Sequence, residues 1–350
     1  MKLQHKFGLL LSSLSLFSFI SSAEAEPKVV TSIKPIHSLV TYVMDGVGRP
    51  DLLVDGSSSP HTFQLKPSHA TMLQEADIVF WIGEDLESFL ETPLDSIAAS
   101  AKRVTLMDSD QIELLKFREK NVFDDHHDDH DDHDENEDHA DGHDDHDEHD
   151  EHDEHDEHDE HDEHDEHDEH DEHEGHDDHG HHHGEHDIHF WLDPEIAKTI
   201  VSIASEELSE IDPANKSIYS SNAANAINDL DQLIDNTRSK INSDAKYIVF
   251  HDAYQYFEQR FGIEVIGALT VNPEVLPGAK QLAEIREVIE HESVNCLFSE
   301  PQFNPSIAET IASDTGIKSA VLDPLGAELE PGKDLYFDLI GDMASSFENC

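Results

Sequence analysis

Basic residues are scarce in this 350-residue chain, which has 21 Lys and Arg against 80 Asp and Glu and a formal net charge of −59. The segment 124–187 holds 36 of the acids and none of the bases, so the rest of the chain carries 21 − 44 = −23. Nucleic acids and anionic lipids would be repelled by both parts. We therefore expect cations as binding partners, with no nucleic acid and no direct membrane insertion.

Cysteine is nearly absent as well, because the chain has only Cys296 and Cys350. In an oxidising compartment such a pair is most simply a disulfide, whereas in a reducing one both would be free thiols. The sequence also has no Cys-x-x-Cys, His-Glu-x-x-His, Gly-x-Ser-x-Gly or Walker loop. It therefore lacks the usual motifs of redox, metalloprotease, serine-hydrolase and nucleotide-binding sites.

Long apolar runs are missing beyond residue 25, so no later segment is suited to crossing a bilayer. Residues 1–25 have the pattern of a secretory signal peptide. Lys2 and Lys6 give a positive start, Phe7 to Ile20 form an apolar core, and Ala23-Glu24-Ala25 is a small-x-small cleavage pattern. We expect cleavage after Ala25 and a secreted, soluble mature protein.

One segment of the chain holds most of its histidines. Residues 124–187 contain 22 of the 29 histidines, and Asp-Glu-His repeats nine times from Asp147 to His173. A segment with almost nothing to bury cannot offset the entropy of ordering its backbone, so we expect a disordered loop. Imidazoles beside carboxylates are ligands for Zn²⁺, Cu²⁺ or Ni²⁺. We call residues 124–187 the His-rich tract and expect it to bind metal weakly at several sites.

The remaining sequence alternates strand and helix patterns, which predicts an α/β fold with parallel sheets. Strands are expected at 28–33, 51–54, 77–82 and 104–107, and again at 247–250, 265–269, 295–298 and 320–322. We predict an N-terminal lobe at 26–212 that contains the tract, a rigid linking helix at 213–242, and a similar C-terminal lobe at 243–350.

Three histidines fall where ligands bind in such sheets, beyond the carboxyl ends of strands. His61 follows the second strand, His189 follows the tract, and His251 follows the strand 247–250. A single histidine at such a place is more often structural. Three of them, in a chain with a metal-avid segment, favour a near-tetrahedral Zn²⁺ site.

Six motifs around these residues resemble the metal-type periplasmic solute-binding proteins of ABC importers, specifically the high-affinity zinc-uptake (ZnuA-type) family. The resemblance covers residues 26–350. Its markers are Pro60-His61-Thr-Phe-Gln-Leu-Lys-Pro-Ser68, Ile188-His189-Phe-Trp-Leu-Asp-Pro-Glu195, Phe250-His251-Asp-Ala-Tyr-Gln-Tyr-Phe257, Val271-Asn-Pro-Glu274, Phe298-Ser-Glu-Pro-Gln-Phe303 and Leu322-Asp-Pro-Leu-Gly326.

The resemblance implies two lobes bridged by a rigid helix, with a metal in the interlobe cleft and His61, His189 and His251 as its ligands. Some relatives have a carboxylate where this chain has Pro60, so the fourth position falls to Asp323 or to water. Cys296 and Cys350 match a C-lobe disulfide of zinc-type relatives. Glu300 is expected to line the cleft without binding metal, and His37 and His69 are interpreted as surface or capping residues.

These features favour a non-enzymatic, monomeric periplasmic carrier that captures Zn²⁺ and delivers it to the membrane permease of an ABC importer. Three imidazoles favour zinc over manganese, which prefers more carboxylate oxygen. A manganese, iron or nickel carrier of the same family remains an alternative. So do a zinc hydrolase, because three His and an open position also suit hydrolysis, and a metal buffer based on the tract.

Overall fold

The structure is a computed structural model that describes residues 26–118, 120–122, 184–242, 245–273 and 275–350. The predicted signal peptide and nearly all of the His-rich tract lie outside these residues. Within them, no helix has both the length and the apolar character that crossing a membrane requires.

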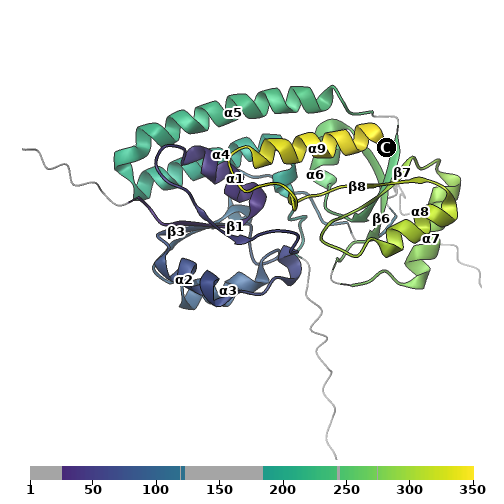
Figure 1. Ribbon diagram of the computed structural model, residues 1–350, viewed down its shortest axis with the longest axis horizontal. Coiled ribbons are helices and arrows are strands. Elements are labelled where there is room, and N and C mark those ends of the chain that lie inside the picture. Colours follow the sequence, from purple (N-terminus) through teal and green to yellow (C-terminus); the bar gives the residue numbers. More distant parts are fainter. Residues whose placement is uncertain (1–25, 119, 123–183, 243–244, 274) are drawn as a thin grey trace, which may run out of the picture. The chain divides into compact units, whose positions relative to one another are not determined.

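The first lobe is built on a four-stranded parallel sheet with the strand order β2-β1-β3-β4. Its two central strands, β1 and β3, are labelled in Figure 1. Its strands are β1 (Val29–Ile33), β2 (Asp51–Val54), β3 (Ile78–Trp81) and β4 (Lys102–Thr105). Its helices include α1 (Lys34–Val43), α2 (Pro67–Glu75) and α3 (Ser88–Ser96). β1 and β3 are buried along their whole length, as expected for central strands covered on both faces.

The second lobe repeats this plan with the strand order β6-β5-β7-β8, again all parallel. Its elements are β5 (Lys246–His251), α6 (Gln255–Phe261), β6 (Glu264–Thr270), α7 (Ala279–His291), β7 (Cys296–Ser299), α8 (Ser306–Thr315), β8 (Lys318–Val321) and α9 (Leu335–Asn349). One face of this sheet packs against α7 and α8 in a separate apolar cluster that includes Ile248, Leu297 and Ile311. The predicted α/β fold with two similar parallel-sheet lobes is confirmed.

Two long helices follow the first sheet in the chain. α4 (Pro194–Ile211) begins after the 3₁₀ turn η3 (Phe190–Leu192), and Asp193 caps it by accepting the Glu195 N–H at 2.8 Å. The predicted linking helix consists of a 3₁₀ turn, η4 (Pro213–Asn215), and helix α5 (Lys216–Arg238), which packs along α4 and contacts α1 and α9. The sequence analysis passed over α3, a short helix with Pro93 inside it.

The chain on either side of the tract forms a small ladder that the sequence analysis missed. Lys116 pairs antiparallel with His186, and the Asp187 N–H donates to Leu115 O at 2.8 Å. Residues 185–187 are therefore part of the folded body, so the predicted tract end at Asp187 is wrong. Asp187 itself is buried.

Residues just before the tract contact the second lobe, although the sequence places them in the first. Val122 forms a bridge with Gly267 of β6, and the Asn121 amide donates to Ala268 O and Leu269 O at 3.0 and 2.9 Å. Arg118 forms ion pairs with Asp252 and Glu258 at 2.9 and 2.6 Å. These contacts hold Arg118, Asn121 and Val122 against the second lobe.

A loop after β8, residues 322–329, receives hydrogen bonds from the first lobe. The buried Lys34 ammonium donates to Gly326 O, Ala327 O and Leu329 O at 3.1, 2.9 and 3.1 Å. The Trp191 indole N–H donates to Pro324 O at 2.9 Å. These three charge-assisted hydrogen bonds from one ammonium hold residues 326–329 against the first lobe.

The predicted disulfide between Cys296 and Cys350 is confirmed, and it ties β7 to the residue after α9 with a Cα–Cα distance of 5.7 Å. It closes a loop with a sequence separation of 54 residues. Replacing both cysteines with serine should lower the free energy of unfolding by roughly 4 kcal/mol in the chain-entropy model, with a wider experimental range of about 2–5 kcal/mol. Urea unfolding of the oxidised protein and the double variant measures this. Equal midpoints and equal slopes would show that the bridge adds nothing.

Candidate metal site

The structure brings the three histidines together, as the sequence predicts. His61 lies in η1 (Pro60–Thr62), a 3₁₀ turn after β2, while His189 caps the N-terminus of η3. His251 is the last residue of β5, next to the point where the chain order of the second sheet reverses between β5 and β7. Ligands in open parallel sheets bind at such switch points.

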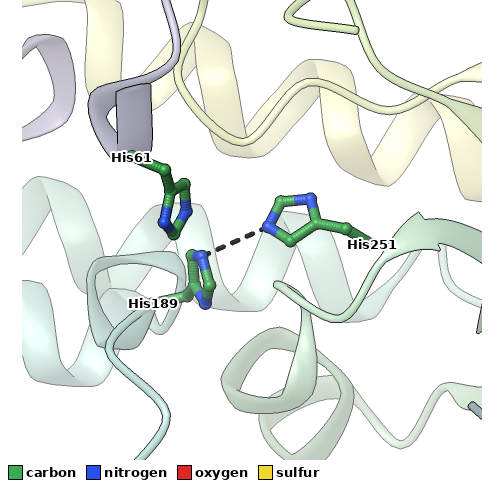
Figure 2. Close-up of side chains that lie close together, drawn as sticks. All are labelled: His61, His189 and His251. Carbon is green, nitrogen blue, oxygen red and sulfur yellow. Dashed lines mark hydrogen bonds between the residues drawn. The ribbon is translucent and has the colours of Figure 1, made fainter. Parts of the chain in front are cut away.

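The side chains converge on one point (Figure 2). Ring nitrogens of His61, His189 and His251 all lie within 4.8 Å of one another, and no other group of three or more His, Cys, Asp or Glu in the described parts of the chain does this. Nε2 of His189 lies 3.3 Å from Nε2 of His251. Two nitrogens bound to a tetrahedral Zn²⁺ at about 2.0–2.1 Å lie roughly 3.3–3.4 Å apart, so this spacing fits the ion.

Two buried carboxylates fix which nitrogen faces the centre. Nδ1 of His189 lies 2.8 Å from Asp187 Oδ1, and Nδ1 of His251 lies 2.8 and 2.9 Å from the two oxygens of Glu300. A carboxylate accepts the Nδ1–H and thereby leaves Nε2 with its lone pair exposed. Both Nε2 atoms can therefore bind a cation placed between them.

The charges around His189 and His251 favour binding of a cation. Burial is the largest influence on the pKa of His251 and lowers it, but the charge and hydrogen bond of Glu300, together with the charges of Asp252 and Asp187, outweigh burial and raise that pKa. Burial raises the pKa of Asp187 to about 6, while the His189 N–H and the charge of Arg118 oppose the shift. The negative charge of these two carboxylates stabilises a cation at the imidazoles.

The sequence analysis missed the role of these two carboxylates. It assigned Asp187 to the tract and expected Glu300 only to line the cleft. The available signal was local: Asp187 stands two residues before His189, and Glu300 directly follows β7, the strand beside β5.

Asp323, expected to compete with water for the fourth position, does not join the group of histidines. Its Oδ1 accepts hydrogen bonds from Leu325 N–H, Gly326 N–H and the Gln302 amide at 3.0, 3.0 and 2.9 Å, and its Oδ2 accepts one from Ala327 N–H at 2.6 Å. The carboxylate thus holds the loop that Lys34 also binds. Its observed role in this structure is to shape that loop.

Two other histidines have structural roles. His37 is buried, its Nε2 lies 3.1 Å from Pro50 O, and burial lowers its pKa to about 4. The interpretation of His37 as a surface residue is therefore wrong. His69 accepts the Lys66 N–H through Nδ1 at 3.1 Å, which confirms that it caps α2.

Comparison with known proteins assigns the family. A family model described as zinc-uptake complex component A, periplasmic, matches residues 29–350. The chain belongs to this family.

Its relatives match along almost their whole length. The high-affinity zinc uptake system protein ZnuA of Brucella abortus (strain 2308) is 43% identical over 347 residues, covering 98% of each chain. The protein of the same name from Haemophilus influenzae is 40% identical over 348 residues, with the same coverage. A crystal structure of ZnuA has the same fold, with a TM-score of 0.66 at 21% identity over 92% of this chain and 97% of that one.

The contact between Glu300 and His251 generates a prediction. Glu300→Gln keeps an oxygen that can accept the Nδ1–H but removes the charge that favours a cation, so the affinity for Zn²⁺ should fall by about 10–100-fold. Competition with a chromophoric zinc chelator measures the change. Glu309→Gln, an exposed site in the first turn of α8, is the matched control and should bind zinc like the wild type. Equal affinities for both variants would contradict the assigned role of Glu300.

Proposed function

We propose that this chain captures Zn²⁺ in the periplasm at His61, His189 and His251 and delivers it to the membrane permease of an ABC importer. The observation that carries the proposal is the convergence of three imidazoles, two of which are aimed by buried carboxylates. The zinc-uptake names of the relatives, which match over nearly full length, support the same cargo.

The donor set favours zinc among the possible cargoes. Three neutral imidazole nitrogens and one further position match tetrahedral Zn²⁺, whereas manganese prefers more carboxylate oxygen. We propose water at the fourth position, because Asp323 already accepts four hydrogen bonds within its own loop. A labile fourth ligand also suits a site that must release its ion.

Membership of a zinc-uptake family places the chain among carriers and not among enzymes. The site agrees with that assignment. The carboxylate nearest to His251 is Glu300, and both of its oxygens are engaged with the imidazole. It is therefore placed to support a ligand and not to act as a general base on bound water.

Export and oligomeric state complete the proposal. Residues 1–25 act as a signal peptide that is cleaved after Ala25, and the mature chain works as a monomer with one site between its lobes. Mass spectrometry of the exported protein should find Glu26 at its N-terminus, and light scattering should give a single-chain mass.

Truncation of any of the three histidines should weaken the tight site by orders of magnitude, because it removes one of three protein ligands. His61→Ala, His189→Ala and His251→Ala should also lose most of the zinc-dependent rise in melting temperature, since that rise scales with the logarithm of zinc concentration over Kd. Calorimetric titration and thermal unfolding, in a chain without residues 124–182, measure both effects.

His291→Ala is a matched control, because His291 ends α7 and lies outside the metal group. It should keep the affinity and the thermal shift of the parent. Wild-type affinity in all three site variants would refute the ligand assignment.

The His-rich tract is proposed to be a low-affinity antenna that raises the local concentration of zinc beside His189. Deleting residues 124–182 should remove several weak sites from a zinc titration and leave one tight site unchanged. The deletion must stop short of Gly184, because Glu185 and Asp187 pair with the chain before the tract. A short Gly-Ser linker replaces the removed residues. Loss of the tight site in this variant, with the fold intact by circular dichroism, would make the tract the primary binding element.

A further inference from the structure

The loop between β6 and α7 carries two adjacent aliphatic side chains that face solvent. Val275 is 60% exposed and Leu276 is 77% exposed. Among the described residues, the other large apolar side chains with high exposure are Val321 at 52% and Ile97 and Ile218 at 37% each. Single exposed apolar residues are ordinary, but a neighbouring pair with the two highest values needs a reason.

The base of this loop is braced. The Thr270 hydroxyl donates to Asn272 O at 2.6 Å and accepts the Asn272 N–H at 3.1 Å. The Val275 N–H donates to Asn272 O at 3.1 Å, and the Gly278 N–H donates to Gln281 Oε1 at 2.7 Å where α7 begins. These bonds hold the backbone before and after Val275 and Leu276, whose side chains are exposed to solvent.

The same loop forms a wall of the metal site. Val271 and Pro273 line a cavity together with His61 and His189. Gly184 and residues 186–188 line the same cavity. A protein that receives an ion from these imidazoles through this cavity must cover its rim. Val275 and Leu276 follow Pro273 and Glu274 in the chain and lie within reach of any partner seated there.

We propose that Val275 and Leu276 form the apolar anchor by which this chain docks on the permease of its importer, with the two side chains inserted in an apolar pocket of that protein. The proposal rests on the proposed function and names the contact that delivery requires. A protein partner fits better than a lipid surface, because the chain outside the tract carries a net charge of −23 and anionic membranes attract basic segments.

The test uses the full-length mature chain, loaded with zinc, and its cognate permease–ATPase complex in phosphatidylcholine liposomes. The ATPase rate is measured against the concentration of the chain for the wild type and for Val275→Ser/Leu276→Ser. The double variant should need at least about tenfold more protein for half-maximal stimulation, which corresponds to about 1.4 kcal/mol. Its zinc affinity and melting temperature should equal those of the wild type. Ile218→Ser, at an exposed apolar residue of α5, is the control and should stimulate normally.

The outcomes separate this inference from the function on which it rests. Unchanged half-maximal stimulation by the double variant, beside a wild type that stimulates, would overturn the anchor and leave the carrier function intact. A wild type that binds zinc but never stimulates the complex would overturn both. Sedimentation with protein-free liposomes tests the lipid alternative: binding by the wild type that the double variant loses would assign the anchor to the membrane and refute a protein pocket.

Discussion

The structure depends on the contact between buried imidazoles and buried carboxylates. His189 and His251 are 5% and 3% exposed, and each gives its Nδ1 to a carboxylate that is itself buried. Without these carboxylates, the buried environment would disfavour binding of a charged ion. With them, the Nε2 lone pairs face each other across the width of a tetrahedral zinc site, and the negative charge lies behind the ligands instead of in the first coordination shell. That arrangement suits a divalent cation and leaves one position from which the cation could depart.

The fold supplies the positions of these groups. The two strands β5 and β7 are neighbours in the second sheet, so His251 and Glu300 leave it side by side. The first lobe contributes His61 and His189 through 3₁₀ turns. Lys34 and Trp191 then join the lobes through the loop after β8, and Asp323 shapes that loop from within. The aspartate that resembles a ligand thus acts at a distance from the site, by holding the junction beside it.

Much of this architecture follows from sequence patterns. β2 has the predicted bounds, and His61 and His251 lie where the sequence places them, after β2 and at the end of β5. The rest depends on where side chains point, which one sequence does not show. Asp187 continues the acidic, His-rich sequence of the tract, yet hydrogen bonds with Leu115, His189 and Tyr256 make it part of the folded body. Asp323 has the ligand motif, yet four hydrogen-bond donors occupy its oxygens. Burial of His37 is compensated by a hydrogen bond between its ring and the carbonyl of Pro50, 13 residues away. No local sequence pattern encodes that contact.

X-ray absorption at the zinc edge tests the central claim most directly. The sample is the mature chain without residues 124–182, loaded with one equivalent of Zn²⁺. The account predicts four light-atom neighbours at about 2.0–2.1 Å and the outer-shell scattering of three imidazole rings. The spectrum of His251→Ala should lose one ring. Fewer than three imidazoles in the parent, or a shell dominated by carboxylate oxygen, would contradict the three-histidine site.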